Sequence, residues 1–276
     1  MSSSNRDSCS MCPYTAVSLL KSCSNLRDME MGRHIHAEIA RLGFLQGNAF
    51  VASALLAMYA KCGCTVKARE VFDKLQVCNQ NVVTWTLLIT RFIEHGESEG
   101  ALQLFEQMQL EGINPNSITF ISALKACADL RGISKGKAMH AKIERHGLLE
   151  KDAVTVGSTL VDMYGKCGLL EEAQKVFDKF RFHSKGSWNA IIAAYAECEH
   201  SEEAIECFDQ MQEEGAFPDS ITVVCVLKAC GFSGMVEKGQ QIHSEVMLKG
   251  LDIEPLVGNT LVCIEHGVHD QALIYF

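Results

Sequence analysis

The sequence predicts an all-α protein, an α-solenoid superhelix of about seven to eight helix-turn-helix units. Three observations support this prediction. Short motifs recur at a fixed period, apolar residues within each period follow helical spacing, and the few prolines fall between the expected units. Because 47% of the residues are hydrophobic and 21% are charged, the 276-residue chain can bury a substantial core.

A long period, of roughly 104 residues, is visible in two motifs. The cysteines of a Lys-x-Cys motif lie 104 and 103 residues apart, at Cys23, Cys127 and Cys230. The histidines of a Gly-x-x-x-His motif keep the same steps, at His36, His140 and His243. A Met-Tyr-x-Lys-Cys-Gly motif follows the first two copies, beginning at Met58 and Met163. Motifs that keep their register over such distances indicate a repeat architecture.

The long period divides into three shorter units of about 35 residues. An Ala-x-x-x-Phe pair falls near the same place in five of them: Ala68–Phe72, Ala101–Phe105, Ala173–Phe177, Ala204–Phe208 and Ala272–Phe276. After a short N-terminal segment at 1–12, we expect the solenoid to span 13–276. The expected units are 13–48, 49–81, 82–116, 117–152, 153–184, 185–219, 220–254 and a partial unit at 255–276.

Each unit is predicted to form two helices, as residues 82–116 illustrate. Trp85, Ile89 and Phe92 recur at helical spacing before Gly96 interrupts the pattern, and Phe105 belongs to a second apolar stripe. The four prolines lie at unit junctions, at Pro13, Pro115, Pro218 and Pro255. One helix pair cannot cover its own apolar faces, so we expect neighbouring units to stack and bury them.

Composition and charge limit the classes of function. The net charge of −9 argues against non-specific coating of nucleic acid, although it leaves room for a local binding groove. No apolar run approaches the roughly 18 residues that a transmembrane helix needs, so no membrane partner is expected. Thirteen cysteines without a secretory signal indicate a reducing compartment, where thiols serve as small buried hydrophobic groups.

No catalytic, metal or cofactor site is predicted. The repeated histidines take the place that phenylalanines hold in other units, which favours a core role over metal binding. Trp85 and Trp188 share apolar helical spacing with Ile89 and Ile192 and are predicted to be core residues. The sequence contains no nucleophile triad or phosphate-binding glycine loop, and no zinc deaminase signature is complete. The chain is therefore expected not to be an enzyme.

The unit endings resemble those of pentatricopeptide repeat (PPR) proteins. These endings read Glu-Gly-Ile-Asn-Pro-Asn at 111–116 and Glu-Gly-Ala-Phe-Pro-Asp at 214–219. The alternation of long, short and standard units is similar to the plant PLS subfamily, and the resemblance covers nearly the whole chain from Pro13. It implies sequence-specific binding of single-stranded RNA in mitochondria or chloroplasts, in RNA modification by C-to-U editing or in RNA processing.

The resemblance also bears on partners and location. Such proteins often carry C-terminal E and DYW deaminase domains, which we expect this chain to lack because it stops within a repeat. It would then recruit an editing deaminase or another editing-complex protein in trans, or be a truncated fragment without its effector domain. The short segment before the first unit is not a clear transit peptide, so the expected organellar location depends on the resemblance.

In the family that the chain resembles, each unit reads one base through its fifth and last residues, with the N-terminal unit toward the 5′ end of the RNA. Three units carry readable pairs: Ser53 with Asn81, Thr86 with Asn116, and Asn189 with Asp219. The resemblance implies adenine for the first two pairs and uracil for the third. The pair Ser158 with Ser184 matches no common combination, and the long units have apolar fifth residues, at Val17, Ile121 and Val224.

Two further kinds of contact follow from the resemblance. The second residue of a unit stacks between neighbouring bases, a role that Phe50 and Val83 suit and Gly186 does not. Lys61 and Lys166 occupy a place from which a lysine approaches the RNA phosphates. The alternative is a helical-repeat scaffold that binds protein, which would not require polar fifth and last residues in phase.

Overall fold

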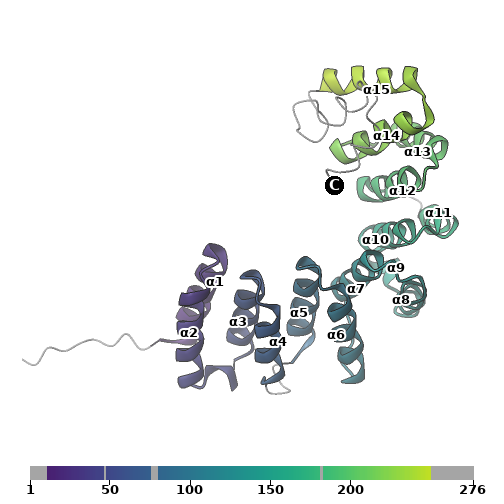
Figure 1. Cartoon of the computed structure of the whole chain (residues 1–276). Helices are drawn as coiled ribbons and strands as arrows, with labels where there is room; N and C mark the ends of the chain where they lie inside the picture. The colour runs from purple at the N-terminus through teal and green to yellow at the C-terminus, as the bar shows by residue number, and fades with distance from the viewer. Residues whose placement is uncertain (1–10, 47, 76–79, 181–182, 250–276) are drawn as a thin grey trace, which may run out of the picture. The chain divides into compact units, whose positions relative to one another are not determined.

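The computed structural model describes residues 11–46, 48–75, 80–180 and 183–249, and these residues form helices and no strands (Figure 1). The predicted partial unit at 255–276, including the Ala272–Phe276 pair, lies outside the described residues. Most of the predicted N-terminal segment, residues 1–10, also lies outside them.

The helices alternate along the chain as pairs. The first helices of the pairs are α1 (Pro13–Leu26), α3 (Ala49–Lys61), α5 (Val82–Glu94), α7 (Ser117–Asp129), α10 (Ala153–Lys166), α12 (Lys185–Glu197) and α14 (Ser220–Ser233). The second helices are α2 (Met29–Arg41), α4 (Thr65–Asp73), α6 (Ser98–Leu110), α8 (Ile133–Arg145), α11 (Leu170–Asp178), α13 (Ser201–Glu213) and α15 (Val236–Lys249). Two short elements, η1 (Phe44–Gln46) and α9 (Leu148–Lys151), follow α2 and α8.

The chain divides into two compact parts between Ala126 and Cys127, and each is built by stacking helix pairs. In the N-terminal part, α1, α3 and α5 lie side by side, and each packs on its own second helix (Figure 1). In the C-terminal part, α10, α12 and α14 form the equivalent row and pack on α11, α13 and α15 (Figure 1). The predicted all-α solenoid class is therefore confirmed.

The core of each part is centred on aromatic side chains from successive units. Trp85 and Trp188 are completely buried, which confirms their prediction as core residues. The ring of Phe72 meets that of Trp85 edge to face at 4.5 Å, and Phe177 meets Trp188 at 4.8 Å. These contacts join the second helix of one unit to the first helix of the next, so the stacking is held by aromatic packing.

The repeated histidines have a structural role in the described parts of α2 and α8. His36 Nδ1 lies 2.8 Å from the Tyr59 hydroxyl, and His140 Nδ1 lies 2.9 Å from the Tyr164 hydroxyl. Burial lowers the pKa of both imidazoles, so the neutral rings can accept these hydrogen bonds. Among the described residues, no group of three or more metal-binding side chains is close enough to hold an ion.

The thiols of the Lys-x-Cys motif are buried, which confirms the interpretation that they are core groups. Cys23, Cys127 and Cys230 occupy the same place in α1, α7 and α14. Burial raises the pKa of all three thiols, to about 11 for Cys127 and Cys230. Since the thiolate is the reactive form, these cysteines pack as hydrophobic groups at neutral pH.

Glycines close the tight turns on both sides of a second helix. Gly96 has φ +75° after α5, and Gly112 has φ +74° after α6. Both angles fall in the left-handed region that favours glycine at helix ends. None of the helices in the described ranges is long and apolar enough to cross a membrane.

Candidate nucleic-acid interface

The last residues of the three predicted pairs cap the first helices that follow them. Asn81 Oδ1 accepts hydrogen bonds from the backbone N–H groups of Val83 and Thr84, at 2.9 and 3.2 Å. Asn116 accepts from the Thr119 N–H at 2.9 Å, and Asp219 accepts from the Thr222 N–H at 3.1 Å. Capping explains the Asn and Asp side chains at these places and was not predicted from the sequence.

The predicted pair Thr86 and Asn116 is joined by a third side chain. The hydroxyl of Thr86 in α5 lies 2.7 Å from that of Thr119 in α7. The Thr119 hydroxyl in turn donates to Asn116 Oδ1 at 2.8 Å. Thr86 is 8% exposed and Asn116 is exposed, so Thr86 lies among packed helices and Asn116 lies at the surface.

The predicted pair Asn189 and Asp219 is in direct contact. Asn189 Nδ2 donates to the two carboxylate oxygens of Asp219, at 3.0 and 3.1 Å. The Thr222 hydroxyl donates to Asn189 Oδ1 at 2.6 Å. The structure therefore brings this pair together with the threonine that occupies the same place in α14 as Thr119 does in α7.

The environment of Asp219 keeps its carboxyl group ionised. Burial alone would raise its pKa, but hydrogen bonds from the Thr222 N–H, the Asn189 amide and the Thr222 hydroxyl outweigh burial and hold the pKa below the ordinary value of 3.8. At neutral pH the Asp219 side chain is thus an acceptor only, while Asn189 presents an amide donor.

The remaining predicted pair, Ser53 and Asn81, is not joined through a threonine or by direct contact in the described residues. The hydroxyl of Ser53 donates to the Ala49 carbonyl of its own helix at 2.8 Å. Asn81 caps α5 through its side-chain oxygen. Ser158, from the pair that matches no common combination, also bonds within its own helix, to the Val154 carbonyl at 2.7 Å. In these two units the fifth residue is held by its own backbone.

Exposed apolar side chains mark the second position of the first helices. Phe50 is 81% exposed and Val83 is 59% exposed, although the residue that follows each of them, Val51 or Thr84, is completely buried. The same position carries exposed apolar residues in the long units, at Tyr14, Ile118 and Ile221. Sequence reasoning missed these three, although counting two residues from each helix start would have found them. Gly186 has no side chain to add at this position.

The predicted phosphate contacts lie at the C-terminal ends of their helices. Lys61 and Lys166 are the last residues of α3 and α10, and both are exposed. The negative end of a helix dipole favours a cation there, and Lys166 Nζ lies 3.2 Å from Asp162 Oδ2. The structure thus does not bring these lysines to the predicted base-reading pairs.

Another set of lysines lies on the first helices of the long units. Each lysine comes seven residues after the second position of its unit and four residues after the fifth. The set comprises Lys21, Lys125 and Lys228, the lysines of the Lys-x-Cys motif. Residues at such spacing share one face of a helix. Lys21 and Lys125 are exposed, and Lys228 is half-buried. The motif was visible in the sequence, but its lysine was not assigned a role.

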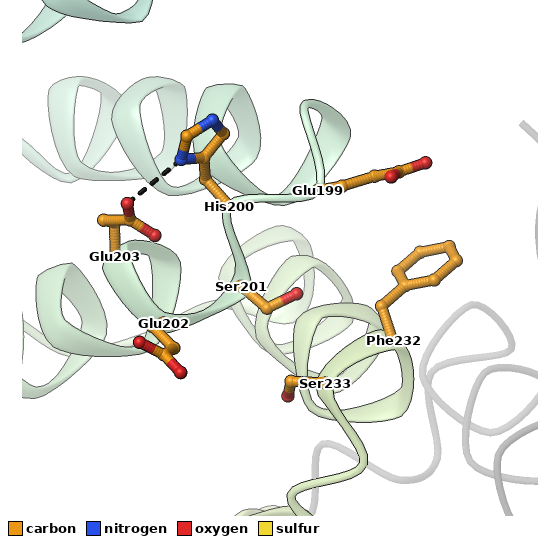
Figure 2. A pocket seen from close by; sticks show the side chains of 7 residues that line it. All are labelled: Glu199, His200, Ser201, Glu202, Glu203, Phe232 and Ser233. Carbon is orange, nitrogen blue, oxygen red and sulfur yellow. Dashed lines mark hydrogen bonds and ion pairs between the residues drawn. The ribbon is translucent and has the colours of Figure 1, made fainter.

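A separate pocket of about 400 Å³ lies at the turn between α12 and α13, against the end of α14 (Figure 2). Glu199, Glu202, Glu203, His200 and Phe232 contribute to its lining. His200 Nδ1 lies 3.0 Å from Glu203 Oε1, and this hydrogen bond lowers the pKa of Glu203 (Figure 2). None of the residues predicted to contact RNA lines this pocket.

Comparison with known proteins gives matches along most of the chain. The sequence pattern of the PPR repeat family matches residues 80–129 and 183–231, and the PPR repeat pattern matches 50–79 and 158–183. Together these segments cover more than half of the chain.

Curated relatives come from Arabidopsis thaliana. Putative pentatricopeptide repeat-containing protein At1g68930 is 36% identical over 89% of this chain and 32% of its own length. The chloroplastic protein CRR2 is 36% identical over 88% of this chain and 37% of its length. The mitochondrial protein At3g09040 is 36% identical over 87% of this chain and 23% of its length. The chain thus spans about a third or less of the length of these relatives.

Solved structures of a maize repeat protein share the fold. The crystal structure of PPR10 from maize superposes with a TM-score of 0.73 at 22% identity, over 96% of this chain and 38% of that one. PPR10 in complex with an 18-nt psaJ RNA element superposes with a TM-score of 0.77, over 96% of this chain and 39% of that one. From the matched repeat patterns and the stacked helix pairs, the chain belongs to the pentatricopeptide repeat family.

Proposed function

We propose that the chain binds single-stranded RNA in a sequence-specific way, with each readable unit selecting one base. The observation that carries this proposal is the arrangement at the N-terminal ends of the first helices. Polar side chains of the fifth and last positions are linked there, Thr86 to Asn116 through Thr119 and Asn189 to Asp219 directly. Exposed apolar side chains such as Phe50 and Val83 stand at the same helix ends, where they can stack on bases.

The hydrogen-bonding character of each pair supports the bases proposed for it. Asn116 uses its side-chain oxygen on Thr119, which leaves its amide N–H groups to donate to the N1 atom of adenine. Asn189 and Asp219 offer a donor and an acceptor, which complement the O4 atom and the N3–H group of uracil. With Ser53 and Asn81 reading adenine, the proposed target is two adenines, two weakly specified bases and a uracil, from 5′ to 3′.

The finer parts of the proposal concern the biological setting. We place the chain in the PLS subfamily and in a mitochondrion or chloroplast, since relatives named mitochondrial and chloroplastic match most of it. Its proposed contribution is to C-to-U editing or RNA processing as a binding module without catalytic residues of its own. An editing deaminase or another editing-complex protein acting in trans would then supply the chemistry.

Selection from a randomised RNA pool tests the proposal. The full chain is expected to enrich RNAs with two adjacent adenines followed, after two variable positions, by a uracil. Binding should weaken as salt increases, because salt screens the proposed contacts of Lys61 and Lys166 with the RNA phosphates. Recovery of RNAs without any base preference would overturn the modular proposal and favour a helical scaffold that binds protein.

A further inference from the structure

Two threonines occupy the same position behind the two joined pairs. Thr119 is the third residue of α7, Thr222 is the third residue of α14, and both are completely buried. Each hydroxyl contacts the fifth residue of the preceding unit, 33 positions earlier in the chain. Each threonine therefore connects the fifth residue of the preceding unit to the capping residue at the start of the threonine's own helix.

The contacts of Thr119 determine which way the protons point. A hydroxyl has one proton, and only a proton from Thr119 can lie between its oxygen and Asn116 Oδ1, 2.8 Å away. If that proton pointed at Thr86 instead, the oxygens of Thr119 and Asn116 would face each other without a proton. The arrangement that satisfies both short contacts therefore has Thr86 donating to Thr119 across 2.7 Å.

This proton direction gives Thr86 and Asn116 opposite characters toward a base. Thr86 has used its proton and can only accept, whereas Asn116 has used its oxygen and can only donate. Adenine complements that pattern with the donor amine at N6 and the acceptor at N1. Guanine opposes it at both atoms, because its O6 is an acceptor and its N1 carries a proton.

Thr222 has the corresponding effect on Asn189. Its hydroxyl donates to Asn189 Oδ1 at 2.6 Å, which turns the amide nitrogen toward Asp219. The Thr222 hydroxyl also lies 3.1 Å from Asp219 Oδ1, but a flipped Asn189 amide would place its oxygen against the carboxylate, where neither group carries a proton. Asn189 is thus held as a donor beside the Asp219 acceptor.

We infer that Thr119 and Thr222 are positioning residues that set the base preference of the pairs Thr86/Asn116 and Asn189/Asp219. They do so by directing the protons of the fifth residue while remaining buried, without touching the base themselves. The inference rests on the proposed RNA-binding function, and it adds a third residue to the determinants of specificity in these two units.

The test compares four forms of the full chain: wild type, Thr119→Val, Thr119→Ser and Thr222→Val. Valine keeps the shape of threonine without its hydroxyl, and serine restores the hydroxyl. Competition binding uses RNAs of the proposed target that differ only at the second adenine or only at the uracil. Urea unfolding of each form monitors the fold, and the two valine variants serve as controls for each other because both remove one buried hydroxyl.

Wild type should prefer adenine over guanine at the second position by about tenfold, the discrimination of one good base-edge contact. In Thr119→Val this ratio should fall to roughly twofold or threefold while the preference for uracil is unchanged, and Thr119→Ser should recover it. Thr222→Val should show the reverse pattern, with the uracil preference reduced and the adenine preference kept.

The outcomes separate this inference from the proposed function. If wild type reads both bases and the valine variants keep its preferences, the inference is wrong and the proposed function stands. Equal losses at both positions in either valine variant would also overturn it, because the hydroxyl would then act through general stability. If wild type shows no base preference, the proposed function itself fails.

Discussion

The junctions α3/α5 and α5/α7 carry pairs predicted to read the same base, yet they hold their fifth residues differently. Ser53 donates to the carbonyl of Ala49 in its own helix. Thr86 instead contacts Thr119 in the next unit, and through it Asn116. The difference teaches that two similar residue pairs can hold their polar atoms through different partners, one within its own helix and one across the junction.

This difference has a consequence for base selection. A side chain held by its neighbour across a junction keeps its donor and acceptor directions when the base arrives, which lowers the cost of ordering on binding. We therefore expect the α5/α7 junction to discriminate adenine from guanine more strongly than the α3/α5 junction.

The largest expected effect comes from removing the packing beneath the α5/α7 junction. Phe105 in α6 is 1% exposed, and its ring contacts that of Phe120 in α7 at 5.5 Å. Phe105→Ala should cost about 3–5 kcal/mol in the free energy of unfolding and loosen neighbouring units. Phe208→Ala, at 2% exposure in α13, should behave alike in the C-terminal part.

Phe50→Ala is the control for this prediction because it removes the same atoms from an 81% exposed site. Its urea midpoint should stay close to that of wild type, while its RNA binding weakens through lost stacking. A midpoint for Phe105→Ala as high as that of Phe50→Ala would show that the described packing at this junction is incorrect.

A smaller effect should distinguish the two fifth residues in the absence of RNA. Thr86→Val removes a partner of the buried Thr119 hydroxyl and should cost about 1 kcal/mol of stability. Ser53→Ala removes only a bond to its own helix and introduces a better helix former, so its stability should change little. Equal losses by urea unfolding would argue against the difference between the junctions.

The smallest effect concerns pH, because the Asn189/Asp219 pair is ionisable and the Thr86/Asn116 pair is not. The pKa of Asp219 is held below 3.8, so its stabilising contribution is present above that value and is lost as the pH falls through the folded-state pKa. The difference in urea midpoint between wild type and Asp219→Asn should therefore narrow below about pH 3.8. A constant difference would mean that the ionised carboxylate contributes nothing.

Much of the fold could be predicted because burial follows helical spacing within each repeat. Trp85 and Cys127 were recognised as core residues from their phase in the first helix, and both are completely buried. Exposed apolar residues such as Ile118 were missed, since they sit beside core residues in an apolar stretch and only the helix start separates them.

The candidate site was less accessible to sequence reasoning. Asn116 and Asp219 were noted for base reading, but their capping role depends on where the next helix begins. Thr119 looks like an ordinary helix residue, and its partner Thr86 lies 33 positions away. Such a contact depends on how two helices stack, which the period of the sequence alone does not reveal.

The central claim is that each joined pair selects a base through its donors and acceptors, and changing Asn116 to aspartate tests it most directly. Aspartate can cap α7 as asparagine does, but it replaces the amide donor with an acceptor-only carboxylate. Competition binding would compare RNAs that carry adenine or guanine at the second target position.

The account predicts that wild type prefers adenine and that Asn116→Asp moves the preference toward guanine by roughly 1–3 kcal/mol, since the carboxylate accepts from the guanine N1–H. The preference for uracil at the position of Asn189 and Asp219 should not change. A variant that keeps the wild-type preference for adenine, while binding RNA and remaining folded, would contradict the account.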